Sequence, residues 1–169
     1  TLYRNYSAIN YVSVTNPNTE TLGAGLYHYI YNTTGGTNWS TSASLGTFDL
    51  TVNTATPSLT LSVTNATYPT VGTINASESN TGDSDVNYTA YIDGTFHFSG
   101  STINQLVTLS GSSHTIIYNS TAGTNYSSTS ITRLLNIAKA TPTGSLTITG
   151  SVWTIESGTQ VTIGLSESN

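Results

Sequence analysis

Side chains that could do chemistry are mostly hydroxyls in this chain: of 169 residues, 34 are Thr and 24 are Ser. Nucleophilic hydrolysis needs such a hydroxyl beside a histidine that is oriented by a carboxylate. No Gly-x-Ser-x-Gly stretch is present, and the eight acidic residues are scattered rather than paired as in glycosidases. His28, His97 and His114 lack metal-ligand spacing such as His-x-x-x-His. We therefore predict no enzyme, and we expect His114, which alternates with Ile116 and Tyr118, to be a packed strand residue.

Asparagines carry a second possible chemistry, because half of the sixteen stand in Asn-x-Ser/Thr sequons that accept N-linked glycans. Three pairs recur at matching places of an internal repeat described below. The alternative is that these are loop asparagines that serve turns. We expect several of them to be glycosylated outside the cell; the eight are Asn5, Asn32, Asn38, Asn65, Asn75, Asn87, Asn119 and Asn125.

The stretch "TGDSDV" contains Asp83 and Asp85, whose carboxylate oxygens could bind Ca²⁺. Glu78 and Asp93 are nearby in sequence and could add further oxygen ligands. The matching stretch, "TLYRNYS", has neither aspartate. A solvated loop is the favoured interpretation, so we predict neither a metal nor another cofactor.

Aromatic side chains could form a face on which sugars stack. Tyr27, Tyr29 and Tyr31 alternate along one predicted strand, whereas core packing is the better interpretation for Tyr31 and Tyr118. The full set is Tyr27, Tyr29, Tyr31, Trp39, Tyr118, Tyr126 and Trp153.

Composition limits the remaining classes of function. The net charge is -5 with only three basic residues, which argues against nucleic acid as a partner. No apolar run approaches the length of a membrane span, about 18 residues, and no signal peptide is visible. Hydrophobic residues make up 36% of the chain, enough to bury a core, and the Thr, Val, Ile and Tyr bias favours β-strands. The one helix-like patch, "ITRLLNIAKA", is better explained as a strand.

The chain repeats itself with a period of about 85 residues. "YNTTGGTNWSTS" at 31–42 matches "YNSTAGTNYSSTS" at 118–130, "TATPSLTL" at 54–61 matches "KATPTGSLTI" at 139–148, and "NASESN" at 75–80 matches "GLSESN" at 164–169. The start, Asn5-Tyr6-Ser7-Ala8, matches Asn87-Tyr88-Thr89-Ala90. We therefore expect a complete unit at 57–140, the last two thirds of a unit at 1–56, and the first third of another at 141–169.

Each unit is predicted to hold about seven short strands, because Gly, Asn, Ser and Pro clusters interrupt alternating segments about every 8–12 residues. In the complete unit the predicted strands are 58–64, 70–78, 86–92, 94–98, 104–109, 113–118 and 130–138. Short, regularly spaced strands indicate an all-β antiparallel sandwich.

The repeat resembles the immunoglobulin-like tandem domains of large bacterial and archaeal surface proteins and adhesins. The resemblance rests on "ATP" at 55–57 and 140–142, on "GSSHTIIYNSTAGTNYSSTS" at 111–130, and on its weaker counterpart at 25–42. It implies seven-stranded sandwiches in tandem, a fold that most often serves as a spacer, stalk or adhesive module.

A unit with an odd number of strands has its two ends at opposite poles, so the two fragments are not expected to complete each other within one chain. We expect identical copies to associate head to tail, as separate subunits or as consecutive repeats of one giant chain. The predicted function is a structural repeat of an extracellular filament or cell-surface stalk, and sequons in a chain without cysteine are compatible with an archaeal source. The alternative is a carbohydrate-binding module of an adhesin.

Overall fold

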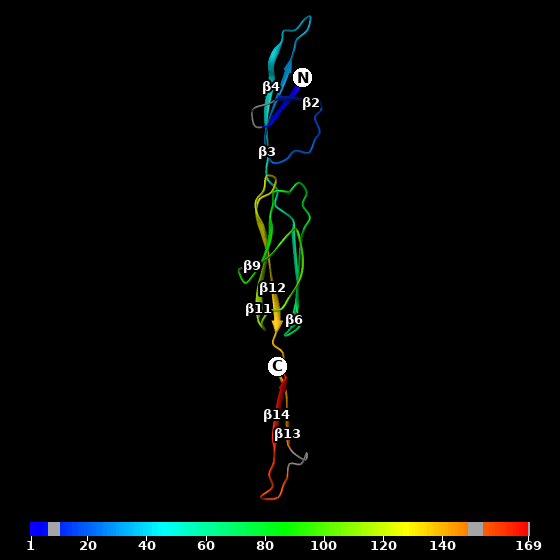
Figure 1. Ribbon diagram of the computed structural model, residues 1–169. Helices are drawn as coiled ribbons and strands as arrows, with labels where there is room; N and C mark the ends of the chain where they lie inside the picture. Colours follow the sequence, from blue (N-terminus) through cyan, green and yellow to red (C-terminus); the bar gives the residue numbers. More distant parts are fainter. Residues whose placement is uncertain (7–10, 149–153, 169) are drawn as a thin grey trace.

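The computed structural model describes residues 1–6, 11–148 and 154–168, and every regular element among them is a β-strand. The strands form four sheets, arranged as three parts that follow one another along an elongated molecule (Figure 1). A four-stranded sheet lies at one end, two sheets form the middle, and a hairpin lies at the other end. The prediction of an all-β chain is confirmed. A search of the described residues for a helix long and apolar enough to cross a membrane finds none.

The middle part is built from two sheets that share one core, the arrangement of a β-sandwich. One sheet has the order β10-β7-β5 and the other the order β6-β12-β11-β8-β9. All pairs are antiparallel except β6 with β12, which is parallel. The strands are β5 (Leu59–Thr64), β6 (Ala66–Thr67), β7 (Gly72–Glu78), β8 (Tyr88–Ile92), β9 (Thr95–Ser99), β10 (Thr102–Val107), β11 (Ser113–Ser120) and β12 (Thr129–Ala138).

Alternation along these strands places one face of each sheet in the core. In β11 every second side chain is buried, so Ile116 and Tyr118 are fully inaccessible and His114 is nearly so. Leu135 on β12 and Ile74 on β7 close the same core from the two sheets. Gly72 permits this approach, because a Cβ there would lie 3.1 Å from both Leu135 methyl groups. The seven predicted strands are confirmed, with ends that differ by at most two residues. The last of them, β12, shows that the helix-like patch at 131–140 is a strand as far as Ala138. The packed role of His114 is also confirmed, whereas the short strand β6 was not predicted.

A two-residue turn joins β8 to β9 within the predicted "IDGT" gap. Asp93 and Gly94 both have positive φ, 50° and 81°. Positive φ at both central residues matches the twist of the flanking strands, and Asp-Gly is a favoured pair for it.

The N-terminal sheet has the order β2-β1-β3-β4, formed by β1 (Leu2–Tyr6), β2 (Tyr11–Val14), β3 (Gly25–Thr33) and β4 (Ser42–Val52). Its last two strands repeat the register of β11 and β12. Tyr31 pairs with Gly46, and Tyr118 pairs with Ile131. The pairs correspond when the repeat is aligned on both sides of an irregularity that β3–β4 has between Tyr31 and Thr33 and that β11–β12 lacks.

Strand β1 departs from that repeat. In the sandwich, Tyr88 pairs with Ser120, whose counterpart in the N-terminal sheet is Thr33. Tyr6, the counterpart of Tyr88, instead pairs with Tyr27, six residues earlier along β3. The expected equivalence of Asn5 and Asn87 is therefore not reproduced in the pairing. The other two residues of the match, Ser7 and Ala8, lie outside the described residues.

The C-terminal hairpin pairs β13 (Thr143–Ile148) with β14 (Ile163–Ser168). Its register matches that of β5 with β7. In each pair two hydroxyls meet across the strands at 2.7 Å, Thr60 with Ser77 and Ser145 with Ser166. No third strand pairs with this hairpin among the described residues.

Candidate functional site: an open sheet face and an uncovered hairpin

One face of the N-terminal sheet corresponds to the core face of the sandwich but lies open. We call the side of β3 and β4 that carries Tyr29, Tyr31, Phe48 and Leu50 the open face; Tyr29 lies opposite Phe48 across the two strands. Tyr31 is 48% exposed, whereas its counterpart Tyr118 is 0% exposed. Phe48 is also exposed. The same strand pair in the same register is therefore covered in one unit and uncovered in the other.

The end of this face nearest the sandwich is covered by the irregular segment 15–24. Glu20 forms an ion pair with Arg4, and the Arg4 guanidinium lies 5.6 Å from the centroid of the Tyr27 ring. The Tyr27 hydroxyl donates to the Gly23 carbonyl at 2.9 Å. The hydrogen bond to Glu20 raises the pKa of Arg4.

Segment 15–24 corresponds to strand β10 and the turn that follows it. In the sandwich, β10 is held by pairing with β7. The N-terminal sheet has no opposing layer among the described residues, so this segment has no strand to pair with. One local contact survives: Tyr27 reaches the Gly23 carbonyl just as its counterpart His114 reaches the Ser110 carbonyl, through Nε2 at 3.0 Å.

The C-terminal hairpin has apolar side chains that no other sheet covers among the described residues. Leu146 lies opposite Leu165, and both are exposed, at 51% and 83%. Their counterparts in the sandwich, Leu61 and Ala76, also lie opposite each other but are buried in the core. Ile163, the counterpart of the inaccessible Ile74, is 61% exposed. An isolated two-stranded hairpin with an apolar face is marginal in water and is normally covered by another layer.

A junction of hydrogen bonds joins the N-terminal sheet to the sandwich. Ala55 lies parallel beside Tyr126, its N–H donates to the Asn125 carbonyl at 2.9 Å, and its carbonyl accepts from the Ser127 N–H at 2.9 Å. The Asn125 side chain accepts from the Ala24 N–H at 2.9 Å. It also donates to the Gly82 carbonyl at 3.1 Å, so one amide links three segments that are far apart in sequence.

The predicted glycan acceptors fall in three environments. Asn38, Asn65 and Asn87 are exposed, and Asn5 is fully buried in β1. The half-buried acceptors are Asn32, Asn75, Asn119 and Asn125. Asn119 accepts a hydrogen bond from Thr89, and Asn125 is held in the junction. Exposed acceptors leave room for a glycan, whereas a glycan on Asn5 would have to displace the packing of the sheet.

The predicted calcium ligands are used within the fold. Asp83 accepts from the Tyr88 hydroxyl, and Asp85 accepts from both the N–H and the hydroxyl of Thr124 at 2.6 Å. The hydrogen bonds from Thr124 lower the pKa of Asp85. Within residues 1–6, 11–148 and 154–168, no three His, Cys, Asp or Glu side chains are grouped so as to hold a metal ion.

Three residues that the sequence patterns did not bring together form a serine–histidine–aspartate chain. His114 Nε2 lies 3.0 Å from Ser112 Oγ, and its Nδ1 lies 2.7 Å from Asp93 Oδ2. Nε2 also lies 3.0 Å from the Ser110 carbonyl, which can only accept, so Nε2 carries a proton and cannot take one from Ser112. The Ser110 carbonyl and then Asp93 raise the pKa of His114. The cluster clamps a turn rather than activating a nucleophile.

The aromatic residues proposed for sugar stacking do not gather on one surface. Tyr27 and Tyr118 are buried, and the Tyr126 hydroxyl is bound to the Thr81 carbonyl. Trp39 is 81% exposed at the tip between β3 and β4. Trp153 lies outside the described residues. Burial of Tyr118 confirms its predicted core role, whereas Tyr31, also predicted to pack in a core, is half exposed.

Comparison of the sequence with protein-family models and with curated proteins finds no match. The assignment of function therefore depends on the open face, the hairpin and the junction.

Proposed function

We propose that this chain is the structural repeat of an extracellular filament or cell-surface stalk, in which successive copies complete each other's immunoglobulin-like sandwiches. The observation that carries the proposal is the match between the open face and the hairpin. The open face lacks the layer that β5 and β7 provide in the sandwich, and β13–β14 is a copy of that layer in sequence and register.

Topology supports the immunoglobulin-like assignment. A three-stranded sheet opposes a larger sheet in which the short β6 runs parallel to the last strand, and the connections cross between layers. The N-terminal sheet has the order of four strands of that larger sheet, β9-β8-β11-β12. Adding the hairpin β13–β14 of a second copy would supply the missing layer.

Energetics favours association over exposure. Burying one Leu or Ile side chain contributes about 1.5–3 kcal/mol, and several such side chains are exposed on the two surfaces. Segment 15–24 would also gain a strand partner. A contact between the two opposite ends of an elongated molecule is heterologous, and it produces a filament when successive copies do not close into a ring.

An extracellular location and glycosylation are part of the proposal. Exposed sequons at Asn65 and Asn87 support them. Mass spectrometry of the native protein should find glycans on these two acceptors and none on Asn5.

The test of assembly is a substitution on the hairpin. Leu165→Asp should abolish filaments seen by electron microscopy and sedimentation, while the melting transition of the sandwich is retained. Leu134→Asp is the matched control, because Leu134 is 59% exposed on the sandwich, away from both surfaces. Filaments that persist in Leu165→Asp would contradict the proposal.

The covalent form is settled by the length of the polypeptide after boiling in strong denaturant. A band at 17.7 kDa plus the mass of the glycans indicates separate subunits. A much larger chain that contains peptides running from "GLSESN" into "TLYRNYS" indicates consecutive repeats.

A further inference from the structure

The residues that form the junction between the N-terminal sheet and the sandwich have counterparts elsewhere in the repeat. Some of these counterparts lie at one end of the molecule and the others lie at the opposite end. The repeat aligns Ala55 with Ala140, and it aligns Asn125 and Tyr126 with Asn38 and Trp39. Ala24, which donates to the Asn125 side chain, aligns with Gly111. Ala140 and Gly111 lie at the hairpin end of the sandwich, whereas Asn38 and Trp39 lie at the tip between β3 and β4.

The tip loop shares one closing hydrogen bond with its counterpart, although Gly35 has a φ of 77° and the counterpart residue Ala122 does not have a positive φ. The Gly36 N–H donates to the Trp39 carbonyl at 2.9 Å, and the Gly123 N–H donates to the Tyr126 carbonyl at 2.9 Å. The surroundings of the two loops also differ. A Cβ on Gly123 would meet Asp85 at 2.6 Å, whereas Gly36 has no atom within 4 Å of that position. The loop is formed, but the surface that packs on it is missing.

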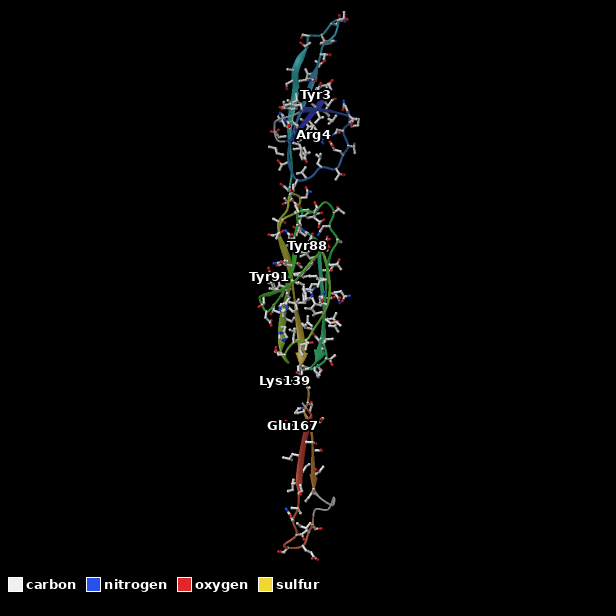
Figure 2. The ribbon with its side chains drawn as sticks, viewed as in Figure 1. Tyr3, Arg4, Tyr88, Tyr91, Lys139 and Glu167 are labelled. Atoms are coloured by element: carbon white, nitrogen blue, oxygen red, sulfur yellow. The ribbon has the colours of Figure 1, made fainter. Side chains whose placement is uncertain are left out.

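A hollow lies at the opposite end of the sandwich, beside the counterparts of the junction residues Ala24 and Ala55. Its volume is about 900 Å³, and it lies where the sandwich meets the hairpin, between Lys139 and Glu167 (Figure 2). Ser110, Gly111 and Ala140 line it. The N–H groups of Gly111 and Ala140 donate to no residue in the described part of the chain, although the N–H groups of their counterparts Ala24 and Ala55 are both bonded.

We propose that loop 35–40 of a second copy docks in this hollow. Asn38 of that copy accepts from the Ala140 N–H through its carbonyl and from the Gly111 N–H through its side chain. Trp39 of that copy lies parallel beside Ala140, as Tyr126 lies beside Ala55, and loses most of its 81% exposure. This inference rests on the proposed head-to-tail assembly and specifies its contact.

One consequence separates Asn38 from the other exposed sequons. Its amide is engaged in the docked contact, as the Asn125 amide is engaged in the existing junction. Assembled copies therefore carry no glycan on Asn38. The comparison site is Asn87, which is exposed, because the side-chain oxygen of Asn65 already accepts from the Asn136 N–H at 2.8 Å.

Engineered disulfides test the contact, because the chain contains no cysteine of its own. Neighbouring residues on paired strands satisfy the Cα separation of about 4.4–6.8 Å that a disulfide requires. Trp39→Cys combined with Ala140→Cys should produce a ladder of linked chains on a non-reducing gel, which collapses with reductant. A second design joins two copies end to end in one polypeptide, with Ala140→Cys in the first copy and Trp39→Cys in the second. These two cysteines should form a disulfide between the copies.

Two matched pairs control the experiment. Ala55→Cys with Tyr126→Cys should close within one chain and give no ladder. Trp39→Cys with Ser84→Cys reports random collisions, since Ser84 is exposed and adjoins Asp85 at the junction end of the sandwich, opposite the hollow.

A measurement without cysteines is the fluorescence emission of Trp39 in a Trp153→Phe background. This emission should shift to shorter wavelength on assembly, because the Trp39 ring leaves water.

The outcomes distinguish the two proposals. Assembly with neither a ladder above the Ser84 control nor a shift in Trp39 emission would overturn this contact and leave head-to-tail completion intact. If neither the single chain nor the joined copies assemble, both proposals fail.

Discussion

The N-terminal sheet and the larger sheet of the sandwich are two versions of one sequence pattern in different surroundings. Their strand orders correspond, and β3–β4 has the register of β11–β12. Yet Tyr31 is half exposed where Tyr118 is inaccessible, and β1 pairs six residues away from the position that the repeat predicts. The difference is the opposing layer, which only the sandwich possesses among the described residues.

This comparison separates local from non-local determinants. The hairpin β3–β4 joins segments close in sequence, so its alternation and turn set its register without help. Strand β1 and segment 15–24 depend on a second sheet, and without that sheet they take other positions.

The largest difference should appear between two leucines at matching positions of the repeat, Leu135 in the sandwich and Leu50 in the N-terminal sheet. Leu135→Ala should destabilise the sandwich by about 2–5 kcal/mol, because Leu135 is fully buried. Its counterpart Leu50 is only half-buried, so Leu50→Ala should cost less than about 1.5 kcal/mol in the monomer. Denaturant unfolding of each variant at low concentration measures both. Equal costs in the monomer would show that the open face is already covered.

A smaller effect should distinguish the two loop glycines. Gly123→Ala should cost about 1–3 kcal/mol, since the new methyl group would overlap Asp85 and Val86. Gly36→Ala should change monomer stability by less than about 0.5 kcal/mol, because the position is open. Thermal unfolding compares them. A large loss from Gly36→Ala in the monomer would mean that its loop is packed without a second copy.

The smallest effect is a pH dependence of stability that the sandwich should show and the N-terminal sheet should not. It arises from the cluster around His114, whose counterpart in the N-terminal sheet is Tyr27. The pKa of His114 is raised above 6.5 in the folded state, so its contribution is complete below pH 6.5 and is lost as pH rises through the raised pKa. Asp93 has its pKa lowered, chiefly by His114, so its contribution is lost as pH falls below about 3.8. The sandwich should be most stable between these limits.

His114→Gln is the variant that tests this pH dependence. It should remove the decline above pH 6.5, whose slope for one proton is at most about 1.4 kcal/mol per pH unit. Unfolding curves from about pH 5 to pH 9 measure it, and the Tyr27→Phe variant, which alters the counterpart position, should retain the decline. An unchanged slope in His114→Gln would assign the pH dependence to another group.

Sequence reasoning predicted the strands of the sandwich well because each strand has alternating apolar residues and turn residues at both ends. It missed β6, since two residues show no periodicity. It also missed the Ser112–His114–Asp93 cluster, because Asp93 reaches His114 only through the pairing of β8 with β11. The loop match at 31–42 and 118–130 was a usable signal for the junction, but nothing in it shows that Ala55 lies beside Tyr126.

The sequence by itself determined the β class, the repeat period and the register of strands that are neighbours in the chain, because these follow from local alternation and turn residues. Only the tertiary structure decided which copies of the pattern are buried. Burial requires an opposing sheet assembled from residues far away, so Tyr31 and Tyr118 differ in exposure although residue type and strand register are the same. The same physical reason makes Leu61 a core residue and its counterpart Leu146 an exposed one.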